Sequence, residues 1–266
     1  MSVIQPILLG IVEGLTEFLP VSSTGHLILA GALLGYDEEK WKVFNIVIQL
    51  GAILAVVVLY WRTFWAVLRG LARRDPPSIR FVRNVVVASI PVAVIGFALH
   101  KKIEALLGRP DVVAVALVAG GIAILAIERL AKTVRISGIA ELPIGTSAVI
   151  GIVQCLAMIP GISRSGATIM GALTLGVERR TAAEFSFFLA IPAMLGATLL
   201  ELVKNRQEIG HGAVGWGTIG IGFTIAFLVA LVVVRGFVRF ISRHGFAPFA
   251  WYRIVAGAAA LAWLKI

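Results

Sequence analysis

Two carboxylates, three consecutive hydroxyl residues and an imidazole lie close together near the N-terminus. They belong to the stretch Glu13-Gly-Leu-Thr-Glu17-Phe-Leu-Pro20-Val-Ser22-Ser23-Thr24-Gly25-His26, which interrupts a strongly apolar sequence. Residues four apart share one face of a helix, so a helix would present both glutamates together. Pro20 ends that helix, and the hydroxyl residues lead into a second helix that we expect to begin at about Gly25. The free N–H groups of such a helix start favour an anion, phosphate in particular.

A second polar cluster places an arginine in another apolar region. It reads Pro160-Gly161-Ile162-Ser163-Arg164-Ser165-Gly166-Ala167-Thr168. An arginine at membrane depth costs about 3 kcal/mol or more unless it faces a cavity or a partner, and its planar fork matches phosphate oxygens. The alternative is a structural ion pair between Arg164 and Glu13 or Glu17, and such a pair could form in the empty site and yield to substrate.

The residue types in the two clusters suit phosphate chemistry. Glu13 and Glu17 could act as a general base or as ligands of a hard divalent cation, or they could form a buried pair neutralised by protonation. His26 could donate or accept a proton, although a lone histidine is more often a satisfied polar group. We predict Glu17, Ser23, His26 and Arg164 as catalytic and Glu13 with Glu17 as the metal site. The predicted phosphate-binding residues are Thr24, Gly25, Ser163, Ser165, Gly166 and Thr168, while Ser22, Ser23 and Thr24 could also cap the helix.

Composition indicates an integral membrane protein that crosses the bilayer several times. Of the 266 residues, 59% are hydrophobic and 14% charged, with a mean hydropathy of +0.97. Six apolar runs are long enough to be spans, at 44–60, 85–99, 112–127, 185–200, 213–234 and 250–264. The net charge of +10 does not indicate nucleic-acid binding, because the basic residues lie in short loops between these runs.

The two polar clusters belong to an internal repeat. Val12-Glu13-Gly-Leu15, Pro20 and Ser23-Thr24-Gly25 are echoed by Val153-Gln154-Cys-Leu156, Pro160 and Arg164-Ser165-Gly166. Each cluster breaks two short apolar segments, which suits a re-entrant hairpin. We therefore expect a single all-α membrane domain with six spans and two hairpins, in repeats at about 1–128 and 139–266.

Loop charge predicts the orientation of the chain. The loops 62–83, 128–141, 177–184 and 235–249 carry a summed charge of +9, whereas 36–42, 100–111 and 201–212 sum to zero. The positive-inside rule puts the first group in the cytoplasm and both termini outside. The repeats are then inverted, and their hairpin turns should meet near the middle of the bilayer.

Both motifs closely resemble those of the bacterial undecaprenyl-diphosphate phosphatases known as bacitracin-resistance proteins. The resemblance covers essentially the whole chain and is weakest in 62–83 and 201–217. It implies an enzyme of the bacterial plasma (inner) membrane that removes the terminal phosphate of undecaprenyl diphosphate and recycles this lipid carrier for peptidoglycan synthesis. It also implies a divalent cation, Mg²⁺ or Ca²⁺, and an active site that opens to the outer, periplasmic face. The functional residues of that family fall on Glu13, Glu17, Ser23, Thr24, His26, Ser163, Arg164, Ser165 and Thr168.

Several alternatives stay open at this level. Ser23 could attack phosphorus with Glu17 or His26 as base, or either base could activate a water. Inverted repeats with broken helices are also typical of secondary transporters, so the chain could instead move a polyprenyl phosphate or another anion. The sequence does not determine the oligomeric state, and a homodimer is compatible with it.

Overall fold

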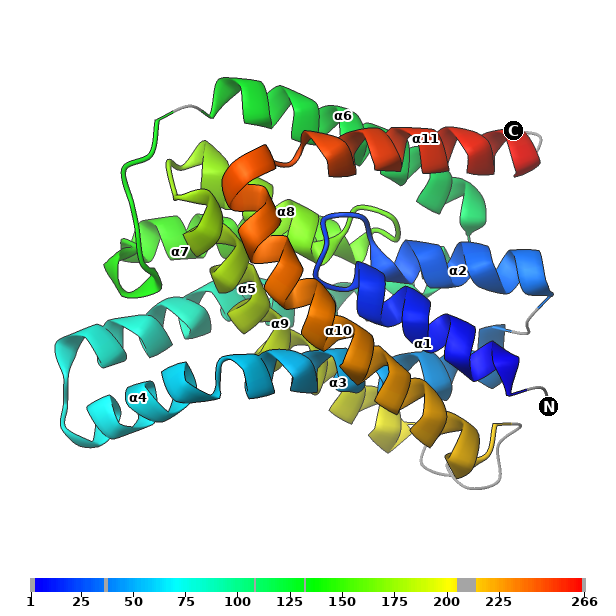
Figure 1. Cartoon of the computed structure of the whole chain (residues 1–266), viewed down its shortest axis with the longest axis horizontal. Helices are drawn as coiled ribbons and strands as arrows, with labels where there is room; N and C mark the ends of the chain where they lie inside the picture. The colour runs from blue at the N-terminus through cyan, green and yellow to red at the C-terminus, as the bar shows by residue number, and fades with distance from the viewer. Residues whose placement is uncertain (1–2, 36–37, 108, 132, 205–213, 265–266) are drawn as a thin grey trace.

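The computed structural model describes residues 3–35, 38–107, 109–131, 133–204 and 214–264 (Figure 1). Within these ranges the chain folds into helices and forms no strand. The predicted all-α class is confirmed. Most of the predicted loop 201–212, and residues 36 and 37 of the loop 36–42, lie outside the described residues.

Six of the described helices are long and apolar enough to cross a membrane, as predicted. They are α3 (Glu38–Leu59), α5 (Pro76–Leu107), α6 (Pro110–Leu130), α9 (Arg179–Lys204), α10 (Trp216–His244) and α11 (Ala247–Leu264). At 1.5 Å per residue, about 20 residues cover the hydrocarbon core of a bilayer. The chain is therefore a multi-pass membrane protein.

The remaining helices are short. They are α1 (Ile4–Thr16), α2 (Ser23–Leu34), α4 (Trp61–Ala72), η1 (Ile139–Glu141), α7 (Ile144–Gln154), η2 (Cys155–Met158) and α8 (Arg164–Thr174). The pair α1 and α2 precedes the spans α3, α5 and α6, and the pair α7 and α8 precedes α9, α10 and α11. Each half thus begins with a pair of short helices followed by three spans, although only the first half has a further short helix, α4, between its spans. The inversion of the halves across the membrane stays a prediction.

The segment 62–83 is helical, although the sequence was interpreted as a loop there. α4 covers its first half and α5 already begins at Pro76, so only a short turn at 73–75 separates the two helices. Trp61, Trp65 and Leu68 are at least half exposed, and no residue of α4 is buried. The arginines that suggested a loop are good helix formers, and the apolar side chains recur at the three- to four-residue spacing of an amphipathic helix.

Small residues bring the first short helix close to a span. α10 crosses the molecule diagonally against α1 and α3, while α6 and α11 run side by side (Figure 1). Gly10 and Gly14 of α1 face α10, where an added Cβ would lie 2.7 Å from the carbonyl oxygens of Gly222 and Ala226. Glycines four residues apart allow two helix backbones to approach closely. In membrane proteins such close packing stabilises helix pairs, because the hydrophobic effect does not drive helices together in lipid. This packing holds α1 beside a span.

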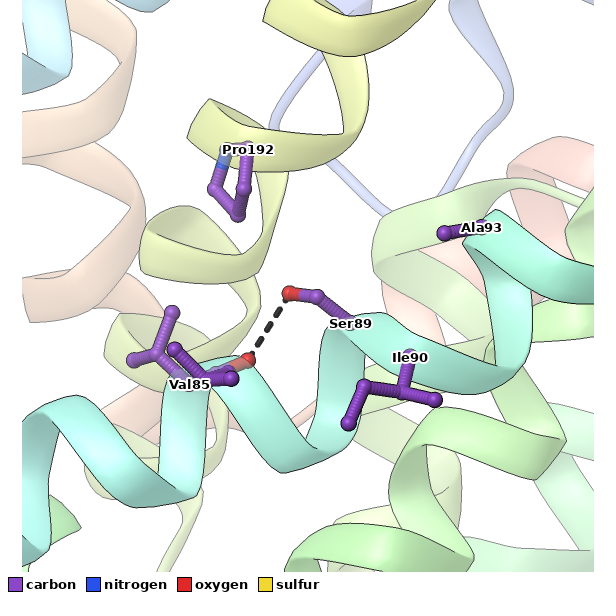
Figure 2. Close-up of a pocket in the computed structure, with 6 residues that line it drawn as sticks. Val85, Ser89, Ile90, Ala93 and Pro192 are labelled. Carbon is purple, nitrogen blue, oxygen red and sulfur yellow. Dashed lines mark hydrogen bonds between the residues drawn. The ribbon is translucent and has the colours of Figure 1, made fainter.

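An apolar groove of about 220 Å³ lies between α5 and α9 (Figure 2). Its lining residues are Val85, Val86, Ser89, Ile90, Ala93 and Pro192. The hydroxyl of Ser89 donates to the carbonyl oxygen of Val85 at 2.8 Å, so it is satisfied within its own helix. The residues that line the groove include no titratable side chain.

Candidate active site

A serine in an unusual backbone conformation caps the start of the second helix in each pair of short helices. Ser22 has φ 72° and Ser163 has φ 78°, a region that side chains other than glycine rarely adopt. Ser22 Oγ accepts the N–H of Gly25 at 3.3 Å, and Ser163 Oγ accepts the N–H of Gly166 at 3.0 Å. Such positions cost about 1 to 3 kcal/mol each and cluster at functional sites. The two caps set where α2 and α8 begin.

Because of these caps, α2 begins at Ser23 and not at about Gly25 as predicted. α1 ends at Thr16, four residues before Pro20, and Glu17 is its C-cap residue. In α8 the equivalent first residue is Arg164. Ser23 and Arg164 therefore occupy the same position at the starts of two half-helices.

One carboxylate joins these two helix starts. Ser23 Oγ donates a short hydrogen bond to Glu17 Oε2, and Arg164 Nη2 donates to Glu17 Oε1 at 3.1 Å. The side chain of Glu17 is 4% exposed and that of Arg164 is 14% exposed, so the ion pair is largely shielded from solvent. Glu17 thus orients a hydroxyl with one oxygen and a guanidinium with the other.

The two hairpin turns also touch directly. Ser165 Oγ donates to the carbonyl oxygen of Leu19 at 2.7 Å and lies 3.0 Å from Ser163 Oγ. Arg164 Nη1 donates to the carbonyl oxygen of Ser186 in α9 at 2.7 Å, while Nε is buried and has no hydrogen-bond partner among the described residues. The two Nη atoms of Arg164 are therefore held by Ser186 and Glu17, while its Nε donor stays unused in the described chain.

A cavity of about 210 Å³ opens at this junction. Its polar lining consists of Glu17, Ser22, Ser23, Thr24, Ser163 and Arg164, and its other lining residues are Ile103, Ala157, Met158, Pro160, Gly161 and Met194. One cavity thus combines a carboxylate, hydroxyls and a guanidinium with an apolar wall. An amphiphilic anion fits such a lining better than a purely polar ligand does.

Glu13 lies one helical turn before Glu17, where its carbonyl oxygen accepts the Glu17 N–H at 3.0 Å. Its side chain is fully buried, and both carboxylate oxygens lack a hydrogen-bond partner in the described chain. The described residues include no cluster of three or more His, Cys, Asp and Glu side chains that could hold a metal. A buried carboxylate with two unused oxygens is nonetheless a suitable ligand for a hard cation that keeps waters or substrate oxygens as its other ligands. The chemistry of Glu13 with Glu17 therefore fits the predicted divalent cation.

His26 points away from this cavity. Its Nδ1 lies 2.7 Å from the carbonyl oxygen of Ser22, which can only accept, so Nδ1 carries a proton. Its Nε2 lies 2.7 Å from the hydroxyl of Tyr252 in α11, and the two rings are stacked. Both ring nitrogens are thus occupied, and neither is hydrogen-bonded to Ser23.

Comparison with known proteins gives the family. A family-wide sequence model described as bacitracin resistance protein BacA matches residues 6–259. The chain belongs to the BacA family. It is 65% identical to the undecaprenyl-diphosphatase of Novosphingobium aromaticivorans, over 100% of this chain and 99% of the relative. It is 61% identical to the undecaprenyl-diphosphatase of Rhizorhabdus wittichii, over 99% of this chain and 98% of the relative. The chain is 58% identical to the undecaprenyl-diphosphatase of Sphingopyxis alaskensis, over 97% of this chain and 96% of the relative. The family resemblance predicted from the two motifs is confirmed.

The BacA-type motifs place their predicted phosphate-binding residues in two layers. Thr24 and Ser163 line the cavity. Ser165 is turned to Leu19, and Thr168 is turned to Ser186 Oγ at 2.7 Å, so these two hydroxyls lie behind the cavity wall. The glycines Gly25 and Gly166 supply the N–H groups that the two serine caps accept. Their individual roles in substrate binding stay predictions.

Two buried residues of this BacA-family protein were missed by the sequence analysis. Ser186 in α9 accepts hydrogen bonds from Thr168 and Arg164. Arg253 in α11 is 1% exposed, and its guanidinium contacts both hairpin turns. The sequence could have indicated Arg253, because it is an ionisable residue inside an apolar run. The same criterion identified Arg164.

Proposed function

We propose that this BacA-family protein is an undecaprenyl-diphosphatase, an integral membrane hydrolase that removes the terminal phosphate of undecaprenyl diphosphate. The product, undecaprenyl phosphate, returns to peptidoglycan synthesis, and its recycling confers resistance to bacitracin. The observation that carries the proposal is the bridge made by Glu17 between the Ser23 hydroxyl and the Arg164 guanidinium, at the wall of one cavity. The relatives named undecaprenyl-diphosphatase, which match this chain over nearly its whole length, support the proposal.

In the proposed reaction Ser23 is the nucleophile and Glu17 is its general base. Glu17 Oε2 takes the hydroxyl proton while Ser23 Oγ forms a bond to the terminal phosphorus. The bond from that phosphorus to the bridging oxygen breaks, and undecaprenyl phosphate leaves. A water then attacks the phosphoserine, the bond between phosphorus and Oγ breaks, and inorganic phosphate leaves with Ser23 restored. Direct attack by a water that Glu17 activates is the competing route.

Arg164 stabilises the charge that develops on the phosphoryl oxygens in this reaction. Arg164 lines the cavity from the first turn of α8, so its guanidinium can approach the phosphoryl oxygens of a bound substrate. Its bond to Glu17 holds the guanidinium in place before substrate arrives. The ion pair and the catalytic role are therefore successive states of the same residue in this proposal.

His26 is assigned a supporting role. Its hydrogen bonds to Ser22 and Tyr252 orient the first turn of α2, where Ser23 lies. Of the two bases considered from the sequence, Glu17 is favoured because only Glu17 contacts the Ser23 hydroxyl.

Glu13 and Glu17 would hold the divalent cation, Mg²⁺ or Ca²⁺. Such a cation neutralises phosphate charge and helps the terminal phosphoryl group to accept electrons. Glu13 would contribute two otherwise unused oxygens, and Glu17 would contribute through the carboxylate that also contacts Ser23. A bound cation would offset the cost of burying the Glu13 carboxylate as an anion.

The substrate and its access route follow from the cavity lining. A diphosphate is polyanionic whereas its prenyl chain stays in the bilayer, so the hydroxyls and guanidinium suit the headgroup. The apolar residues Ile103, Met158 and Met194 suit the first isoprene units. We place the protein in the bacterial plasma membrane with the cavity opening to the outer face, as the family resemblance implies. The distribution of loop charge supports the orientation with both termini outside.

A phosphate-release assay tests this function against transport. Detergent-purified protein has no compartments to transport between, so release of inorganic phosphate in equal amount to undecaprenyl phosphate is expected from a phosphatase alone. A protein that releases no phosphate with Mg²⁺ or Ca²⁺, yet moves the lipid across proteoliposome membranes, would be the transporter or flippase considered as the alternative.

A further inference from the structure

A buried arginine outside the two motifs contacts both hairpin turns. Arg253 lies in α11 and is 1% exposed. All five of its N–H donors find backbone carbonyl oxygens. The acceptors are Leu117 at 3.3 Å from Nε, Pro20 and Ile162 at 3.1 and 2.8 Å from Nη1, and Ala116 and Gly161 at 3.0 and 2.8 Å from Nη2.

The five carbonyl groups come from three separate parts of the chain. Pro20 belongs to the turn between α1 and α2, and Gly161 and Ile162 belong to the turn before α8. The other two carbonyls lie in the middle of α6. Carbonyl groups in irregular turns at membrane depth need donors that lipid cannot supply. The Arg253 guanidinium therefore donates hydrogen bonds to carbonyl groups of both turns and links both turns to α6.

The surroundings of Arg253 leave room for a guanidinium. A Cβ on Gly120 of α6 would lie 2.0 Å from Nη2, and a Cβ on Gly166 of α8 would lie 3.2 Å from Nη1. The hydrogen bonds and ion pairs described for Arg253 include no carboxylate. Its role is thus tied to the geometry of the fork and to backbone contacts, and not to a salt bridge.

We propose that Arg253 is a positioning residue for the phosphatase reaction. It fixes the distance between the Pro20 turn and the Gly161–Ile162 turn. At this distance Ser23, which is hydrogen-bonded to Glu17, and Arg164 line the same cavity. The inference rests on the proposed function for its effect on turnover, but the spacing of the two turns can be measured without any activity.

The first experiment compares Arg253→Lys with a structural control. Lysine keeps the charge but has three donors on one nitrogen, so it cannot make the five hydrogen bonds that the Arg253 fork makes to three elements. We expect kcat to fall at least about tenfold while KM changes less than about threefold, because Arg253 contacts backbone carbonyl groups and is not among the residues that line the cavity. The control is Asn84→Ala, because buried Asn84 Nδ2 also donates to two carbonyls, those of Ile139 and Leu142 at 2.9 Å. It should lower the melting temperature and leave kcat of the folded protein unchanged.

A second variant disturbs the same contact without changing the arginine. Gly120→Ala introduces a methyl group where Nη2 lies, so it displaces the guanidinium from α6. Gly236→Ala is its matched control, since a Cβ at Gly236 of α10 meets nothing within 4 Å. We expect a lower kcat for Gly120→Ala only. This pair keeps the proposal testable if Arg253→Lys does not fold.

The spacing of the turns is measured with spin labels on exposed Leu15 and Leu156, which flank the two turns, in a Cys155→Ser background. A narrow distance distribution is expected with Arg253 and a broader one in Arg253→Lys or Gly120→Ala. An unchanged distribution, or a normal kcat in both variants, overturns the positioning role. A wild-type protein that releases no phosphate contradicts the proposed function alone, and the distance measurement still decides whether Arg253 holds the turns.

Discussion

The two hairpins share one backbone device but carry different chemistry. Ser22 and Ser163 are both caps with positive φ, and each accepts the N–H three residues later. The first hairpin then supplies acids and a hydroxyl, whereas the second supplies a cation. At the repeat position of Glu13 the second hairpin has Gln154, which is buried with both amide atoms unpartnered in the described chain.

The difference indicates how one repeated unit can form an asymmetric active site. The same helix start presents Ser23 in one copy and Arg164 in the other, and Glu17 contacts both. If the two hairpins divide the work in this way, each side should fail differently when it is altered.

The largest effect is expected from Glu17→Gln in the first hairpin. Glutamine keeps the shape of the side chain but cannot take the Ser23 proton, so turnover should fall at least about a hundredfold, the scale of a lost general base. Phosphate release by folded protein measures it. Glu141→Gln, at an exposed glutamate paired with Arg80 at 3.0 Å, should have no effect. A Glu17→Gln protein with more than about a tenth of the wild-type turnover would exclude Glu17 as the base.

Arg164→Lys tests the second hairpin. Lysine keeps the charge but loses the planar fork that reaches Glu17 and the Ser186 carbonyl group together. Turnover should fall at least about tenfold, which corresponds to about 1.4 kcal/mol of transition-state stabilisation. Full activity in a correctly inserted Arg164→Lys protein would mean that only the charge matters.

Glu13→Gln makes the first hairpin resemble the second at this repeat position. The amide keeps the volume but is a poorer ligand for a hard cation. We expect the Mg²⁺ or Ca²⁺ concentration for half-maximal activity to rise about tenfold, with partial recovery of turnover at saturating cation. A titration of activity against each cation measures this. An unchanged cation requirement would remove Glu13 from the metal site.

The smallest effect is expected from Gln154→Met. Methionine is similar in length and removes a buried amide that has no partner, so stability in detergent should stay the same or rise by up to about 1 kcal/mol. Turnover should stay within about twofold. A large loss of turnover would show that the second hairpin takes part in the reaction at this position too, and would break the comparison.

The sequence predicted the six spans, the short helix pairs and the family, because these depend on local hydropathy and on motifs. The helical α4 was missed since its arginines were interpreted only as loop charges. Contacts between distant segments could not be predicted from local patterns. Tyr252 occupies the Nε2 of His26, and Arg253 reaches carbonyls on three other elements, although each lies far from its partners in sequence. The choice between Glu17 and His26 needed this tertiary geometry.

In the proposed reaction Ser23 is a nucleophile and not a helix cap. Ser22, not Ser23, accepts the Gly25 N–H, so Ser23 is free of the capping role in this fold. A lost cap typically costs about 1 kcal/mol of stability, whereas a lost nucleophile nearly abolishes turnover.

The most direct measurement is phosphate release by Ser23→Ala beside Ser22→Ala, with both proteins checked for insertion and folding. We expect Ser23→Ala to be almost inactive with a normal melting temperature, and Ser22→Ala to be less stable and much more active than Ser23→Ala. Wild-type protein quenched in acid during turnover of substrate labelled in its terminal phosphate should carry the label on Ser23. A Ser23→Ala protein that keeps more than about a tenth of the activity, a barrier change below about 1.4 kcal/mol, would contradict covalent catalysis and leave a water activated by Glu17 as the nucleophile.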